Sequence, residues 1–254
     1  MAAEPEAVEG DRAEDTGERS GPVGVGLRMG VGVLVTLFGV AASAIGSVPG
    51  LVVGRDTAGG FALALVGSEL GFVAVGVLFL VVTGRGVAYL NLDVPSGHRG
   101  WALVVGATVG LFLARSLAIL RASQFGVAPA GSSVTQVDVP LPVLVAILLP
   151  AMVLVVGPAE ELLFRGVLQT YLREIASAPV AIVGAGLLFG GIHLPTLVGA
   201  SGVGVAVSLA VITLVGFAIG WLYEHTGSLP AAMFAHGVYN ALIVASAYAF
   251  ETLG

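Results

Sequence analysis

Seven long apolar segments follow one another along this chain and restrict the folds that it can adopt. They span residues 27–53, 61–82, 101–120, 142–172, 179–194, 203–223 and 229–250. About 20 apolar residues cross a bilayer when they are helical, and a helix satisfies its own backbone hydrogen bonds in lipid. We therefore predict an all-α, polytopic transmembrane bundle of about seven helices with a polar cavity inside. The first helix is expected to break late, at Pro49 and Gly50.

The composition agrees with a membrane bundle. Hydrophobic residues make up 57% of the chain and charged residues only 10%, and the mean hydropathy is +1.01. Soluble domains usually carry about 25% charged residues. The chain has no cysteine, which excludes disulfides and thiolate chemistry.

The N-terminal segment has a different composition. Seven of the sixteen acidic residues lie within the first eighteen positions, among Ala and Gly. Such a sequence cannot bury a core and predicts a disordered acidic tail over residues 1–22. The expected transmembrane domain is then 23–254.

The arginines predict the orientation, because positively charged residues are enriched in cytoplasmic loops. With a cytosolic N-terminus, the outer segments hold only Arg55 and Arg121. The inner segments hold seven arginines, namely Arg12, Arg19, Arg28, Arg85, Arg99, Arg165 and Arg173. We expect a multi-pass protein of the cell membrane with its N-terminus in the cytosol.

Three ionisable residues stand out inside the fourth apolar segment. Glu160, Glu161 and Arg165 lie in the sequence PAEELLFR, where charged groups are costly and by default mark a functional site. Glu161 and Arg165 are four residues apart and share a helix face, which predicts an ion pair. Glu160 points about 100° away and stays free for chemistry. A buried polar cluster that only accommodates Arg165 is the alternative.

Two of the three later helices, 179–194 and 229–250, each carry a pair of residues at a spacing of four. Phe189 and His193 share one face, as do His236 and Asn240. Taken singly, such residues are typical of helix packing in membranes. Counted along their helices at 1.5 Å per residue, however, His193, His236 and Asn240 reach depths that overlap with that of Glu160. Together they predict a catalytic site.

Two chemistries fit these residues. In the first, Glu160 and His193 activate a water, while His236 and Asn240 donate hydrogen bonds to the oxyanion that forms on a peptide carbonyl. In the second, His193, His236 and Glu160 bind a catalytic zinc. The sequence contains no His-Glu-x-x-His motif, which weakens the zinc alternative.

Two more charged residues, Glu69 and Arg115, lie inside apolar segments. We expect either that they form an ion pair across helices or that Arg115 extends its guanidinium to the membrane interface.

The motifs in this order resemble a known family. The pattern Glu160-Glu161-x-x-x-Arg165, Phe189-x-x-x-His193 and His236-x-x-x-Asn240 is similar to that of the CPBP family, the CAAX prenyl endopeptidases and bacteriocin-processing enzymes also called the Abi family. The run from Gly220 to Leu229 resembles the segment before the last motif. The similarity covers about residues 142–245.

The resemblance implies an intramembrane endopeptidase that hydrolyses a peptide bond. It assigns Glu160 as the general base, His193 as an activator of water, and His236 with Asn240 as the oxyanion site. Glu161, Arg165 and Phe189 take supporting roles. The expected partners are membrane lipid and a peptide or membrane-protein substrate, lipidated or not, without nucleic acid. No cofactor is expected, with zinc as the alternative.

Two non-proteolytic functions compete with this interpretation. A membrane immunity or scaffold protein would keep the polar cluster for binding a partner. A transporter would favour repeated halves, and the sequence shows no convincing internal repeat.

Overall fold

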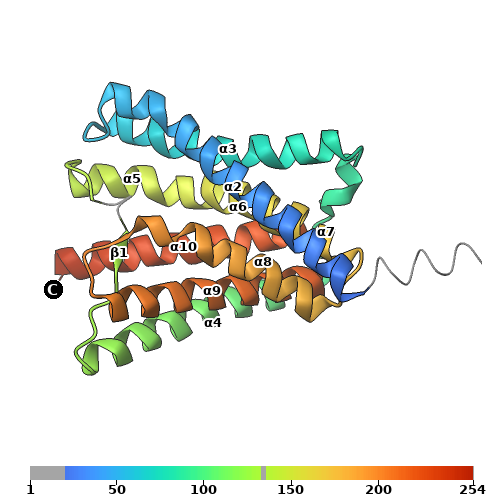
Figure 1. Ribbon diagram of the computed structural model, residues 1–254. Coiled ribbons are helices and arrows are strands. Elements are labelled where there is room, and N and C mark those ends of the chain that lie inside the picture. Colours follow the sequence, from blue (N-terminus) through green and yellow to red (C-terminus); the bar gives the residue numbers. More distant parts are fainter. Residues whose placement is uncertain (1–20, 133–135, 254) are drawn as a thin grey trace, which may run out of the picture.

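Seven helices that are long and apolar enough to cross a membrane make up the computed structural model, which describes residues 21–132 and 136–253 (Figure 1). The uninterrupted ones are α2 (Pro22–Val53), α3 (Ala58–Val82), α4 (Gly97–Gln124), α8 (Ala178–Ile192), α9 (Gly202–Thr226) and α10 (Leu229–Leu253). The seventh span runs from Leu141 to Arg173 in several pieces. The predicted all-α membrane bundle is thereby confirmed, and the chain is a multi-pass membrane protein.

The first helix differs from its prediction at its start and at the predicted break. It begins at Pro22 rather than at 27, and it continues through Pro49 and Gly50 to Val53, so the predicted break is wrong. Proline is tolerated in membrane helices where a neighbouring helix compensates for the lost hydrogen bond. Here α3 packs directly against the turn, and a Cβ on Gly50 would lie 2.2 Å from the backbone nitrogen of Ala64. The predicted acidic tail falls almost entirely on residues 1–20, outside the described residues.

Helices α2 and α3 pack against each other through glycines. A Cβ on Gly46 would lie 2.0 Å from the carbonyl oxygen of Gly67, and a Cβ on Gly67 would lie 2.1 Å from that of Gly46. Only glycine permits this backbone contact, which is the usual way in which membrane helices approach closely. The α2–α3 pair forms one side of the bundle (Figure 1).

The span that carries the acidic motif is not a regular helix. It consists of α5 (Leu141–Ala151), a π-helical segment (Met152–Val156), α6 (Gly157–Glu161), a second π-helical segment (Leu162–Gln169) and α7 (Thr170–Arg173). The first π segment ends where Gly157 donates to Met152, five residues back, just before Pro158, which has no N–H to donate. Such π segments are frequently found at functional sites, and here two of them enclose Glu160 and Glu161.

The bundle is apolar on its outside and encloses a group of polar residues within an apolar core. Helix α10 packs against α4, α9 and the pieces of the Leu141–Arg173 span, while α8 lies against α9 and the second π segment. Lipid-facing positions carry exposed apolar side chains such as Leu37, Leu154 and Leu214. The buried polar residues include Glu69, Glu160, Glu161, Arg165, Gln169 and His236.

Short elements tie the loops together at one end of the bundle. The strands β1 (Gly131–Ser132) and β2 (Leu197–Val198) pair antiparallel, with Gly131 opposite Val198. They connect the long loop before α5 with the chain that follows His193, through a 3₁₀ turn at Leu194–Thr196. A second 3₁₀ turn, Val87–Leu90, follows α3.

Candidate active site

Glu161 and Arg165 form a completely buried ion pair. The Arg165 Nη1 atom lies 3.0 Å from Glu161 Oε1, and both side chains are 0% exposed. Arg165 also donates through Nη2 to the carbonyl oxygen of Gly216 in α9, at 2.7 Å. The predicted pairing is therefore confirmed. Arg165 also anchors the Leu141–Arg173 span, called the motif helix below, to α9.

A histidine from the last helix joins this pair. The Nδ1 atom of His236 lies 2.7 Å from Glu161 Oε1, the same oxygen that accepts from Arg165. Two glycines allow α6 and α10 to approach this closely. A Cβ on Gly157 would lie 2.7 Å from the carbonyl oxygen of Met233, and a Cβ on Gly237 would lie 2.7 Å from that of Met152. Glu161 therefore fixes the position of the His236 ring.

Glu160 lies between the two histidines. Its Oε2 atom is 3.6 Å from Nε2 of His236, and its Oε1 atom is 4.0 Å from Nε2 of His193. These distances exceed a hydrogen bond, so Glu160 faces both rings without being bonded to either. The Glu160 side chain is 8% exposed and that of His193 is 26% exposed, so the site is most accessible on the side of His193.

The backbone orients His193. Its Nδ1 atom lies 2.9 Å from the carbonyl oxygen of Phe189, four residues back. A carbonyl can only accept, so Nδ1 carries a proton, and Nε2 is the ring nitrogen that faces Glu160. The second ring nitrogen is thereby left available for a polar ligand.

The ring of Phe189 packs against His193, His236 and Arg165. Its ring centroid lies 4.8 Å from that of His193 and 5.5 Å from that of His236. The guanidinium carbon of Arg165 lies 4.9 Å from the Phe189 ring centroid, within reach of a cation–π interaction. The side chain is 2% exposed. Phe189 therefore holds both rings and the cation by packing.

Asn240 is one helical turn beyond His236 on the same face of α10. The side chain is partly buried, and among the described residues no hydrogen-bond partner is found for it. The structure thus brings Glu160, Glu161, Arg165, Phe189, His193 and His236 into one cluster, with Asn240 beside it.

One buried acid of this region was not placed at the site by the sequence. Glu69 of α3 is 7% exposed, and α3 packs against α6, the helix that carries Glu160. The ion pair with Arg115 considered from the sequence is not present among the described residues. The sequence showed only that Glu69 is an acid in the middle of an apolar segment. It could not show which helix the Glu69 side chain faces.

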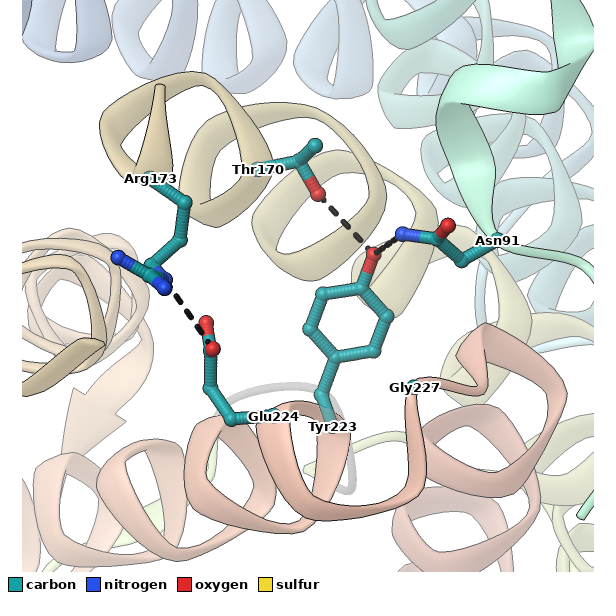
Figure 2. A pocket seen from close by; sticks show the side chains of 6 residues that line it. All are labelled: Asn91, Thr170, Arg173, Tyr223, Glu224 and Gly227. Atoms are coloured by element: carbon teal, nitrogen blue, oxygen red, sulfur yellow. Dashed lines mark hydrogen bonds and ion pairs between the residues drawn. The ribbon is translucent and has the colours of Figure 1, made fainter. Parts of the chain in front are cut away.

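A separate polar cavity of about 160 Å³ lies farther along the motif helix (Figure 2). Thr170 is ten residues beyond Glu160, or about 15 Å along a helix. Around the cavity, Arg173 bonds Glu224 at 3.1 Å, and the Tyr223 hydroxyl lies 2.8 Å from Asn91 Nδ2 and 3.0 Å from the Thr170 hydroxyl. The run from Gly220 to Leu229 noted in the sequence therefore joins α9 to the motif helix.

A charged cluster on Glu174 lies beyond the end of the same span. Its carboxylate accepts from Arg85 at 2.8 Å, from the Tyr89 hydroxyl at 3.0 Å, and from Arg28. Partial burial raises the pKa of Glu174, but the hydrogen bonds from Arg85, Arg28 and Tyr89 outweigh burial and leave the pKa below its ordinary value. Burial, with the nearby Glu174 charge, raises the pKa of Tyr89.

The zinc alternative requires three ligands placed around one ion. Across residues 21–132 and 136–253, no group of three or more His, Asp or Glu side chains has the arrangement of a metal site. Glu160, His193 and His236 are close to one another but are not arranged as such a set.

These features define a membrane-embedded cluster of two glutamates, an arginine and two histidines on three helices. Residues 142–242 match the family model described as type II CAAX prenyl endopeptidase Rce1-like, and the chain therefore carries a domain of this CPBP, or Abi, family. No curated protein and no solved structure shows significant similarity to the chain.

Proposed function

We propose that this protein is an intramembrane endopeptidase that hydrolyses a peptide bond with a water activated by Glu160 and His193. The observation that carries the proposal is the position of Glu160, buried and facing the Nε2 atoms of two histidines without a hydrogen bond to either. The Rce1-like domain supports a CAAX-type protease.

The water would be held between Glu160 and His193. Glu160 accepts its proton while the oxygen attacks the carbonyl carbon, and the Nε2 lone pair of His193 helps to orient it. Because Arg165 already neutralises Glu161, Glu160 is the glutamate that remains free as a general base. The proton then passes from Glu160 to the leaving amine.

The oxyanion would be stabilised from α10. His236 donates from Nδ1 to Glu161, and in its doubly protonated form it also donates from Nε2. The amide of Asn240, which has no partner in the described part of the chain, supplies a second donor. Preorganised donors that meet the developing charge are usually the largest contribution to such catalysis.

The surroundings indicate where a substrate comes from. Seven membrane spans place the cluster inside a lipid-facing bundle, and the exposed side of His193 is its accessible edge. We propose a membrane-associated peptide or protein substrate, with a lipidated C-terminus as the first class to test. We further propose that the N-terminus is cytosolic, in line with the distribution of arginines.

The decisive experiment compares purified wild-type protein with Glu160→Gln on membrane peptides and prenylated C-terminal peptides. Wild type should cleave a substrate, and the variant should lose about 10²–10⁴-fold in rate while keeping its melting temperature. Equal cleavage by both proteins would remove Glu160 as the base. A wild type that cleaves none of these peptides would favour the scaffold alternative.

A further inference from the structure

A charged cluster that the mechanism above does not use lies at one end of the bundle, where α2 begins and where α3 and α7 end (Figure 1). Arg28 near the start of α2 and Arg85 just after α3 both bond the carboxylate of Glu174. Arg85 reaches its two oxygens at 2.8 and 2.9 Å, and Arg28 bonds Oε2. The cluster therefore joins the α2–α3 pair, which lies outside the matched residues 142–242, to the family domain.

The cluster carries one net positive charge. Two guanidinium groups face a single carboxylate, and a glutamate that is bonded by two arginines is ionised at neutral pH. The neighbouring pair of Arg173 and Glu224 adds no net charge. The side chains of Arg28, Arg85 and Glu174 are between 22% and 30% exposed. An anion from outside can therefore reach the excess charge.

Both guanidinium groups keep N–H donors for such an anion. Arg28 bonds through Nη1, to Glu174 and to the carbonyl oxygen of Tyr171 at 2.7 Å. Arg85 bonds Glu174 through Nε and Nη2. Across residues 21–132 and 136–253, no hydrogen-bond partner is found for Nε and Nη2 of Arg28 or for Nη1 of Arg85. Phosphate oxygens match such planar groups of donors in both geometry and charge.

Aromatic rings hold the two arginines in place. The guanidinium carbon of Arg28 lies 4.3 Å from the ring centroid of Tyr171. That of Arg85 lies 5.3 Å from the same ring and 5.1 Å from the ring of Tyr89. All three distances are within reach of a cation–π interaction. Because the arginines are already ordered, less conformational entropy is lost when a ligand binds.

The position of the cluster indicates that the anion is a lipid headgroup. Arg85 lies three residues after the last residue of α3, and Glu174 directly follows the Leu141–Arg173 span. Tyrosines such as Tyr89 and Tyr171 are typical of the level of the headgroups. With the proposed orientation this is the cytoplasmic leaflet, whose anionic lipids attract basic residues. Apolar side chains near Arg28 and Arg85 in the sequence are exposed and could contact the acyl chains: Val23, Leu27, Val81 and Val82.

We propose that Arg28 and Arg85 bind the phosphate of an anionic phospholipid. A phosphodiester carries one negative charge and brings the cluster to neutrality. Glu174 repels the phosphate, so the headgroup contacts the arginines through the N–H groups that Glu174 does not use. The bound lipid stabilises the contact between the α2–α3 pair and the family domain. The proposal does not depend on the protease function, because it involves no residue of the active site.

The first test measures the melting temperature of the full-length protein in detergent as phosphatidylglycerol is added, with zwitterionic phosphatidylcholine for comparison. Phosphatidylglycerol should stabilise wild type more than phosphatidylcholine does. Arg28→Gln and Arg85→Gln should each need about fivefold more phosphatidylglycerol for half of the effect, as expected for the loss of one basic residue at a membrane surface. Arg99→Gln is the matched control, because Arg99 is exposed near the start of α4, which follows α3 at the same end. It should respond as wild type does.

A second measurement is independent of melting behaviour. Native mass spectrometry counts the phosphatidylglycerol molecules that each protein retains, and wild type and Arg99→Gln should retain one more than Arg28→Gln or Arg85→Gln. Equal lipid counts in all four proteins, or equal stabilisation by the two lipids, would overturn the proposal. Inorganic phosphate distinguishes the headgroup from a free anion. If phosphate alone stabilised wild type as much as phosphatidylglycerol does, the assignment to a lipid would be wrong.

Discussion

His236 and Glu161 are 75 residues apart in the chain and meet at 2.7 Å inside the bundle, on the oxygen that also accepts from Arg165. This contact connects the last helix to the acidic motif. It also distinguishes the two adjacent glutamates, because Glu161 bonds a histidine and an arginine while Glu160 has no hydrogen bond among the residues that the structure describes. The difference supports separate structural and catalytic roles.

Arg165→Ala should be strongly destabilising. The substitution leaves Glu161 charged and without its cation at 0% exposure, and breaking a buried pair typically costs about 3–5 kcal/mol. Thermal unfolding in detergent would measure the loss. Arg173→Ala, on the same span and paired with Glu224 nearer the surface, is the matched control and should cost about 1 kcal/mol or less. Equal melting temperatures for Arg165→Ala and wild type would contradict the structural role.

Asn240→Ala should lower kcat with little change in KM. Loss of one oxyanion donor reduces kcat by about 10²–10³-fold, and the charge that it stabilises develops only in the transition state. Steady-state kinetics on a cleaved peptide provide the measurement. The other asparagine, Asn91, bonds Tyr223 away from the site, so Asn91→Ala should leave kcat unchanged. If Asn240→Ala kept the wild-type kcat, Asn240 would have no part in the oxyanion site.

Metal analysis separates the two chemistries. Under the glutamate mechanism, purified protein should contain no stoichiometric zinc and should keep its activity after prolonged chelation. Elemental analysis of wild type, His193→Ala and His236→Ala is the measurement, beside Asn240→Ala as a control that removes a poor zinc ligand. One zinc per chain that vanishes with either histidine would establish the metal mechanism instead.

Glu174 should make stability depend on pH. Its pKa is lower in the folded protein than in the unfolded chain, so its contribution is complete above the unfolded value of about 4.3 and is lost as the pH falls through the folded value. Glu174→Gln should therefore melt below wild type at neutral pH, and the difference should shrink in acid. Glu251→Gln, at an exposed carboxylate, should show no such difference. A gap that persists unchanged at low pH would argue against the charge as its cause.

Cysteine labelling tests the proposed orientation, because the native chain has no cysteine. With a cytosolic N-terminus, a cysteine at position 132 should react with an impermeant reagent in intact cells. A cysteine at position 174 should react only after lysis. The reverse pattern would invert the topology.

The sequence by itself determined the membrane bundle and most of the candidate residues. Long apolar runs commit a segment to lipid regardless of its neighbours, and a charged residue inside such a run stands out without any structure. The pairing of Glu161 with Arg165 was also readable, because a spacing of four places two side chains on one helix face. The order of the motifs indicated the family.

Only the tertiary structure decided which groups meet across helices. Spacing along one helix carries no information on the crossing of two, so the bond from His236 to Glu161 and the packing of α3 against α6 could not be predicted. The π segments and the uninterrupted α2 were missed for a related reason: their backbone geometry depends on glycine contacts with neighbouring helices, as at Gly50 and Gly157. The sequence pattern along one helix identifies the polar side chains, and the packing of the helices determines which of these side chains bond one another.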